Sequence, residues 1–314
     1  MSLEFEDALT DVEAEIAELR KLNEDPKVRF NDEIAILEKR RQELLTDIYG
    51  NLTPWQTVQV ARHRERPNIY DYSSQVFSDF IELHGDRCFG DDAGIVGGFA
   101  TLGEHRVMLL GHQKGRTTED NIKANFGMAT PDGYRKALRL MKLAERFKLP
   151  VVSLIDTPGA YPGLDAEACG QAGAIARNLT EMAALTVPII VLVTGEGGSG
   201  GALGIGVGDR VLMLSHAVYS VISPEGCASI LWRDGAMAST AAEAMKMTAQ
   251  SLLELGIIDD IVEEPLGGAH RDHAKTMKAV STSLQKHLRA LNKVGTKKLI
   301  ERRFNKYAAI GAYS

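Results

Sequence analysis

Two segments of this chain repeat one plan, and this repeat restricts the fold more than any other feature of the sequence. Residues 147–160 read FKLPVVSLIDTPGA, and residues 185–198 read LTVPIIVLVTGEGG. Each segment passes from the end of an expected helix through a proline into an apolar strand and then into a glycine-containing turn. Continuous apolar strands separated by helices are typical of parallel sheets that are covered on both faces. The repeat therefore predicts an α/β fold.

Further elements are expected on both sides of this repeat. Apolar runs at 95–102 and 106–112, joined by Gly103-Glu104-His105, predict a β-hairpin. Asp132 is expected to cap a helix that runs to Phe147. The remaining expected elements are helices at 73–84, 163–185 and 224–232, a short helix after the glycine-rich segment, and strands at 210–214 and 219–222.

The N-terminal fifty residues have the pattern of two amphipathic helices. Leu9, Val12 and Ile16 recur at spacings of three and four, so they share one helical face. A second apolar stripe follows a break near Pro26, and 1–50 is therefore expected to form an antiparallel helical hairpin. Because two helices cannot bury both stripes against each other alone, the hairpin either packs on the main body or serves as an arm for oligomerisation or partner docking.

The rest of the chain divides by composition into a polar connector at 51–72, a core at 73–268 and a helical tail at 269–314. Six basic residues near the end of the tail are expected to form a solvated helix face, namely Lys293, Lys297, Lys298, Arg302, Arg303 and Lys306. A structural or nucleic-acid-binding role would depend on this cluster. The formal net charge of −6 argues against that class, because nucleic acid attracts basic surfaces.

Cysteine usage and hydropathy restrict the location of the protein. The three cysteines, at 88, 169 and 227, form no CxxC pair, and this odd, sparse count fits a reducing compartment and argues against a disulfide scaffold. No apolar run approaches the ~18 residues of a membrane helix. The acidic, amphipathic start lacks the features of a signal peptide. We therefore expect a cytoplasmic protein that does not enter a membrane.

The glycine-rich segment at 195–202, GEGGSGGA, is the most informative for function. It follows an expected buried strand and precedes a short helix, so its N–H groups point toward whatever lies above the turn, and the helix dipole adds positive potential. The segment matches G-x-G-x-x-G, but the next strand ends without the acidic residue that a dinucleotide site needs. Gly201 stands where a P-loop has its lysine, which argues against that site as well.

One catalytic interpretation of this segment is a nucleophile elbow. Residues 197–201 satisfy G-x-S-x-G, with Ser199 as the nucleophile. Asp259 or Asp260, followed by His270, would supply the acid and the base of a triad in the correct order, although no spacing rule confirms them. This is the pattern of a serine hydrolase.

The other catalytic interpretation is an oxyanion hole with no protein nucleophile. Peptide N–H groups at the start of the short helix would stabilise an enolate or a similar anion. A second donor would come from the turn at 156–163 in the neighbouring unit. A third, purely structural interpretation is that both turns are tight loops that let helices pack.

Four further side chains are candidates for substrate binding. Lys114 and Arg116 follow an expected strand and are either loop residues or contacts to an anion, for which a coenzyme A phosphate and a carboxylate are both candidates. Phe126 is expected in the wall of the site. Glu225 either complements the dipole of its helix or lies beside the site.

Five segments together resemble a known family. They are HQKGR at 112–116, IDTPGAYPG at 155–163, GEGGSGGALGIGVGD at 195–209, YSVISPEGCASILW at 219–232 and EPLGGAHR at 264–271. In this order they resemble the carboxyltransferase alpha subunits of bacterial and plastid-type acetyl-CoA carboxylase, and the resemblance runs through essentially the whole chain. It implies a crotonase-like fold, a spiral of ββα units.

The resemblance also implies an activity and a set of partners. Such an enzyme moves a carboxyl group from carboxybiotin, carried on a biotin carboxyl carrier protein, to acetyl-CoA and forms malonyl-CoA for fatty-acid synthesis. The alpha subunit would act only with a beta subunit of the same fold, as an alpha2beta2 heterotetramer, in a system that includes biotin carboxylase. Zinc would be bound by the beta subunit, which fits the sparse cysteines of this chain.

By this resemblance, the chemistry belongs to the backbone of the glycine-rich segment. The N–H groups near Gly200, Gly201 and Ala202 would face the ureido oxygen of biotin, with Gly159 and Ala160 as the complementary wall. Ser199 would then be a turn residue whose hydroxyl group is dispensable.

Overall fold

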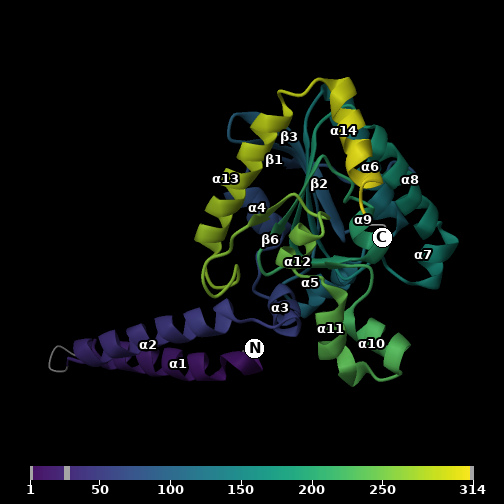
Figure 1. Cartoon of the computed structure of the whole chain (residues 1–314). Helices are drawn as coiled ribbons and strands as arrows, with labels where there is room; N and C mark the ends of the chain where they lie inside the picture. Colours follow the sequence, from purple (N-terminus) through teal and green to yellow (C-terminus); the bar gives the residue numbers. More distant parts are fainter. Residues whose placement is uncertain (1–2, 25–28, 312–314) are drawn as a thin grey trace.

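One sheet forms the centre of the molecule (Figure 1). The computed structural model describes residues 3–24 and 29–311. In that part of the chain the sheet has eight strands, in the order β1-β2-β3-β4-β5-β6-β8, and β7 pairs with the far end of β5. The strands are β1 Ser78–Glu82, β2 Ile95–Leu102, β3 His105–His112, β4 Val151–Thr157, β5 Ile189–Gly198, β6 Arg210–Leu214, β7 Val218–Ser220 and β8 Asp260–Val262.

The repeated segments form two neighbouring parallel strands, as the sequence predicts. In the register of β4 and β5, Val151 pairs with Ile189 and Thr157 with Gly197, so the two strands end at the same edge of the sheet. Their apolar side chains are almost entirely buried. The predicted hairpin is confirmed by the antiparallel pair of β2 and β3. Both turns of the repeat therefore lie together at the carboxyl ends of parallel strands.

Helices cover both faces of the sheet. Figure 1 shows α13 on one side and α6, α8 and α14 on the other. The helices of the body are α3 Pro54–Ala61, α4 Ile69–Gln75, α5 Thr118–Lys123, α6 Pro131–Phe147, α7 Leu164–Ala168, α8 Gln171–Ala184, α9 Ser199–Leu203, α10 Pro224–Trp232, α11 Ala238–Met245, α12 Ala249–Glu254, α13 His273–Leu291 and α14 Thr296–Ala308. No helix in the described residues combines the length and apolar character needed to cross a membrane.

The prediction of a helix at 73–84 is wrong. Helix α4 starts earlier, because Asn68 and Asp71 form a capping box at its first turn. The chain then pairs as β1 with the exposed edge of β2, which satisfies the backbone groups of this segment along the sheet. Tertiary pairing, which local periodicity does not reveal, decides the structure here.

Two expectations about helix ends also need correction. Asp132 does not cap α6, because Thr130 occupies the N-cap position and Pro131 begins the helix. The Asp132 carboxylate instead pairs with Arg135 one turn later. The helix expected over 163–185 is broken into α7 and α8 at Gly170, whose φ of +85° lies in the left-handed region that favours glycine.

The N-terminal segment forms the predicted hairpin of two helices, α1 Asp7–Leu22 and α2 Asn31–Gly50, which projects from the body in Figure 1. Its base is attached to the body. The Tyr49 hydroxyl donates to Glu6 over 2.6 Å, and the Arg271 guanidinium pairs with both Glu6 and Glu13.

The prediction of a solvated basic face in the tail is wrong for Arg303. This side chain is buried and forms two hydrogen bonds to the Asp209 carboxylate, of 2.9 and 2.7 Å. It also donates to the carbonyl oxygens of Met182, Leu185 and Val187. Arg303 therefore fastens α14 to the sheet and to the end of α8, and only part of the basic cluster faces solvent.

Candidate active site

The two repeated turns meet in direct backbone contact at the edge of the sheet. A Cβ atom on Gly201 would lie 2.3 Å from the carbonyl carbon of Gly159 and 2.5 Å from the nitrogen of Ala160. A Cβ atom on Gly198 would lie 2.1 Å from the carbonyl oxygen of Pro158. Only glycine fits at these two positions. The structure thus brings the glycine-rich segment against the turn that the sequence offered as its second wall.

Helix α9 begins at this contact, as the strand-to-helix pattern predicts. Gly198 is its N-cap and has no side chain to occupy the N–H groups of the first turn, for which a helix has no internal partners. Gly200 is open: the nearest atoms to a Cβ there belong to Ile175, at 3.9 Å. Ala202, by contrast, is fully buried. Within this turn, Gly200 is therefore the position that a ligand can approach.

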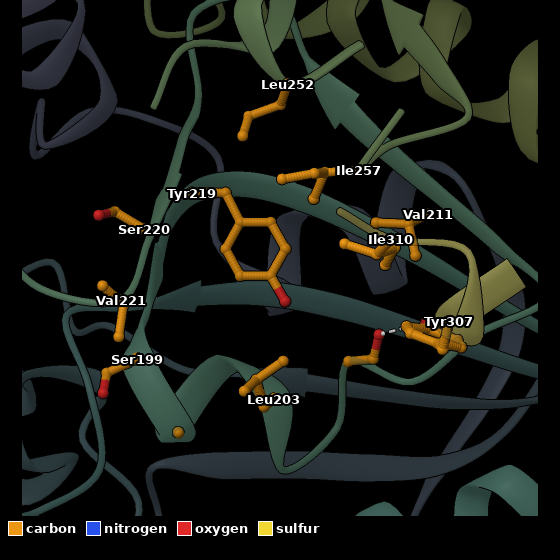
Figure 2. A pocket seen from close by; sticks show the side chains of 12 residues that line it. Ser199, Leu203, Val211, Tyr219, Ser220, Val221, Leu252, Ile257, Tyr307 and Ile310 are labelled. Carbon is orange, nitrogen blue, oxygen red and sulfur yellow. Dashed lines mark hydrogen bonds between the residues drawn. The ribbon is translucent and has the colours of Figure 1, made fainter. Parts of the chain in front are cut away.

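Ser199 is the first residue of α9 and has an unusual backbone. Its φ is +52°, in the left-handed region that non-glycine residues rarely adopt. Such a conformation costs about 1 kcal/mol or more and is held by the surrounding structure. In Figure 2 its side chain points away from the Tyr219 ring.

An apolar cavity of about 300 Å³ lies beside Gly200 (Figure 2). Leu203 of α9 lies on one side of the central Tyr219 ring, and Leu252 and Ile257 lie on the other. Tyr307 and Ile310, from the C-terminal tail, complete the wall. The sequence reasoning missed all of these residues. Leu203 and Tyr219 lie in two of the five segments quoted in the sequence analysis, but Leu252, Ile257, Tyr307 and Ile310 come from distant segments with no motif of their own. Only the folded chain shows that these residues share a cavity.

A network of charges lies under the two turns. The Lys114 ammonium group is 2.8 Å from Asp156 Oδ1 and 2.8 Å from Glu196 Oε2. The Arg62 guanidinium binds the other oxygen of Glu196 over 2.6 Å and also pairs with Glu225. The predicted residues Lys114 and Glu225 therefore both have protein partners. Arg62 was missed, because no sequence pattern shows that α3 reaches this edge of the sheet.

This network shifts the ionisation of its members. Burial alone would lower the pKa of Lys114, but the charges of Asp156 and Glu196 outweigh it and raise that pKa. Burial alone would raise the pKa of Glu196, but Lys114 and Arg62 lower it to about 2. Lys114 and Glu196 are therefore both charged at neutral pH.

The other two predicted substrate-binding residues lie nearer the surface. Arg116 pairs with Asp71 and, with Arg64 and Lys114, lines a second pocket of about 120 Å³. About half of the Phe126 side chain is exposed, and its φ of +56° turns the chain sharply between α5 and α6. Both residues are accessible to a ligand or to another protein.

The residues proposed for a triad are engaged elsewhere. Asp259 pairs with Arg210 and Lys306. Asp260 pairs with Lys286 and His287. The His270 ring stacks on His63 at 4.0 Å, and burial lowers the pKa of His270 to about 3. Within the described residues, no chain of hydrogen bonds connects an acid, His270 and Ser199. The geometry does not support a serine nucleophile.

The described residues also contain no group of three or more His, Cys, Asp or Glu side chains that could hold a metal ion. The cysteines are spread over the fold, with Cys88 and Cys169 exposed and Cys227 partly buried. What this edge of the sheet offers is backbone amides, an apolar cavity and a fixed array of charges.

The chain is similar to known proteins along nearly its whole length. Residues 2–311 match the family model described as acetyl co-enzyme A carboxylase carboxyltransferase-like. A relative from Geobacter metallireducens is 55% identical over 99% of this chain and 98% of its own length, and one from Bacillus cereus (strain ATCC 14579) is 54% identical over 99% and 96%. Both are named acetyl-coenzyme A carboxylase carboxyl transferase subunit alpha.

Two solved structures share the fold. Transcarboxylase 12S aligns with a TM-score of 0.57 at 21% identity, over 70% of this chain and 41% of that one. A subunit of a Pseudomonas malonate decarboxylase hetero-tetramer, in complex with coenzyme A, aligns with a TM-score of 0.58 at 18% identity, over 70% and 89%. At these identities the likeness concerns the fold alone.

Proposed function

This chain belongs to the family of acetyl-CoA carboxylase carboxyltransferase alpha subunits, and we propose that its part in the reaction is to hold the ureido oxygen of biotin with the backbone amides at the start of α9. The enzyme is a biotin-dependent carboxyltransferase of fatty-acid biosynthesis, with the crotonase-like fold that the sequence predicts. The family and the fold do not support the serine hydrolase alternative.

The observation that carries the proposal is the backbone contact between the two turns. Because Gly201 and Gly198 pack directly on the turn at 158–160, the amides of Gly200, Gly201 and Ala202 are held in one fixed arrangement beside Gly159 and Ala160. Donors that are already in place stabilise a developing anion without reorganisation, and one such donor contributes about 10²–10³-fold in rate.

The residues around Gly200 also fit the ring system of biotin. The apolar cavity has a volume typical of small-molecule sites, and Tyr219 and Leu203 offer it flat and aliphatic surfaces. The cofactor, carried on a separate protein, supplies the carboxyl group and a ring nitrogen that can accept a proton. This chain's residues need only bind the ring, exclude water and bear the negative charge on one oxygen.

Arg116 is the predicted anion-binding residue that is best placed for a substrate. Its guanidinium is nearly half exposed at a pocket that also contains Arg64, and planar guanidinium groups suit phosphates and carboxylates. We propose that Arg116 contacts an anionic group of the acyl-CoA and that Phe126 lines its path.

The protein is one subunit of a multi-subunit carboxyltransferase. We propose that its beta subunit covers α10 and the segment just before it, where Ile230 and Leu231 of α10 and the preceding Val221 are between 64% and 78% exposed. Apolar surface of this kind marks an interaction site. We further propose that the two subunits form an alpha2beta2 assembly in the cytoplasm. In this assembly the beta subunit binds zinc, and biotin carboxyl carrier protein and biotin carboxylase are the partners.

The test is reconstitution with the beta subunit. We expect the co-expressed complex to form malonyl-CoA from acetyl-CoA and carboxylated carrier protein, and we expect this chain alone to be inactive. Turnover by purified alpha subunit without beta would refute the shared site. Labelling of Ser199 by a fluorophosphonate probe would instead restore the hydrolase interpretation.

A further inference from the structure

Two acidic side chains stand directly beneath the two turns. Asp156 precedes the turn at 158–160, and Glu196 precedes Gly197 and Gly198. The Glu196 backbone N–H donates to Asp156 Oδ1 over 2.9 Å, so the two residues are neighbours across β4 and β5. Their side chains are only 13% and 11% exposed. Two carboxylates this close and this buried repel each other strongly unless a cation lies between them.

Lys114 supplies that cation from the loop after β3. Its single ammonium group is 2.8 Å from an oxygen of each carboxylate. The same group therefore links the ends of three adjacent strands. The second oxygen of Glu196 is held by Arg62, which connects the network to Glu225 at the first turn of α10.

We propose that Lys114 is a positioning residue: by bridging Asp156 and Glu196, it sets the spacing between the turn at 158–160 and the glycine-rich turn at 197–202. The inference rests on the proposed function and deepens it, because these two turns carry the amides proposed to bind the anion. It assigns Lys114 a role different from the substrate contact that its place in the sequence suggests.

The geometry favours positioning over substrate binding for two reasons. The charge of Lys114 is already offset by two carboxylates, so it offers little net attraction to a further anion. The second reason is that the contact between the two turns leaves no room for a change in their spacing. With backbone atoms packed against Gly198 and Gly201, no intervening side chain can absorb a change in spacing. Repulsion between Asp156 and Glu196 would act directly on that contact.

The first experiment compares kcat and KM in the complex with the beta subunit. For Lys114→Met we expect kcat to fall by about 10²-fold, the effect of a displacement of about 1 Å in an active site, while KM for acetyl-CoA stays near wild type. Replacing Asp156 in the same chain, as Lys114→Met/Asp156→Asn, removes the unbalanced charge and keeps an oxygen for the Glu196 N–H. We expect this double variant to recover at least about tenfold in kcat, because the coupled pair is non-additive.

The second experiment measures amide hydrogen exchange in both turns of the full chain, and it needs no turnover. We expect Lys114→Met to increase exchange in 156–163 and 195–203 together, and the double variant to reverse the increase. Lys142→Met is the matched control, because Lys142 likewise pairs with two acids, Glu145 and Glu181, but lies on α6 away from these turns. It should change neither readout.

Results that would contradict the role of Lys114 differ from the result that would contradict the proposed function. A rise in the KM for acetyl-CoA at unchanged kcat and unchanged exchange would make Lys114 a substrate contact. Loss of activity that Asp156→Asn does not relieve would also overturn the proposal. If the wild-type complex forms no malonyl-CoA, the proposed function fails, while the exchange experiment still decides whether Lys114 couples the two turns.

Discussion

The α-carbon of Gly201 faces the backbone of Gly159 so closely that a methyl group on Gly201 would lie 2.3 Å from the Gly159 carbonyl carbon. No real Cβ contact is that short, so one backbone segment would have to move. The same addition at Gly200, one residue earlier, meets only Ile175 at 3.9 Å. Two adjacent glycines in one motif therefore have different physical reasons to be glycine.

This difference predicts opposite sensitivities. We expect Gly201→Ala to separate the two turns and to lower kcat by about 10²-fold or more, since misplacement of preorganised donors is costly. Gly200→Ala should leave the fold and the melting temperature nearly unchanged and affect mainly the KM for the carboxylated carrier. Thermal unfolding and steady-state kinetics of both variants, in complex with the beta subunit, check this. A stable, fully active Gly201→Ala would contradict the proposed arrangement of the site.

Ser199 provides a second prediction. Because its φ of +52° suits glycine better than serine, Ser199→Gly should retain turnover and should stabilise the fold by about 1 kcal/mol. Ser199→Ala should also retain turnover, because the proposed chemistry uses main-chain amides. Equilibrium denaturation and malonyl-CoA formation are the measurements. An inactive Ser199→Ala in an intact complex would show that the hydroxyl takes part.

The sequence predicted the elements that periodicity and glycine define. Pro150 and Pro188 mark the starts of β4 and β5, and the strand-glycine-helix pattern marks α9. Each of these signals lies within a short window of sequence. The backbone contact of Gly201 with Gly159 follows from the same repeat, because equal units place their turns at the same edge of the sheet.

Long-range partners are what the sequence could not reveal. Arg62 reaches Glu196 across 134 positions, and Arg303 reaches Asp209 across 94. Nothing local distinguishes Arg303, buried and fully bonded, from its neighbour Arg302 on the surface. The prediction of a helix at 73–84 was wrong for the same reason. Residues 78–82 form a strand because they pair with β2, which lies later in the chain.

Comparing substitutions of Arg303 and Arg302 therefore measures how much the buried ion pair of Arg303 contributes to stability. We expect Arg303→Ala to cost about 3–5 kcal/mol of unfolding free energy, because it leaves Asp209 and three carbonyl oxygens buried without their donor. Arg302→Ala should change stability by about 0.5 kcal/mol or less. Chemical denaturation of both variants provides the comparison. Equal effects would mean that α14 is not fastened through Arg303.

His112 gives the last prediction, a dependence of stability on pH. The side chain is 2% exposed at the end of β3, and burial, followed by the nearby charge of Lys114, lowers its pKa to about 3. In the unfolded chain a histidine has a pKa near 6.5, so between pH 6.5 and pH 3 the unfolded state binds a proton that the folded state does not. Stability therefore falls as the pH drops through this window, by about 2 kcal/mol between pH 7 and pH 5 for this one group.

The check is urea denaturation of wild type and His112→Gln across that range. The variant lacks the titrating ring, so its free energy of unfolding should fall less steeply between pH 7 and pH 5, with the difference reaching about 2 kcal/mol at pH 5. Any loss of packing in His112→Gln shifts its whole curve and leaves the slope unaffected, which separates the two effects. Parallel curves for the two proteins would mean that His112 takes up its proton in the folded state as readily as in the unfolded chain, contrary to its burial beneath the glycine-rich turn and beside Lys114.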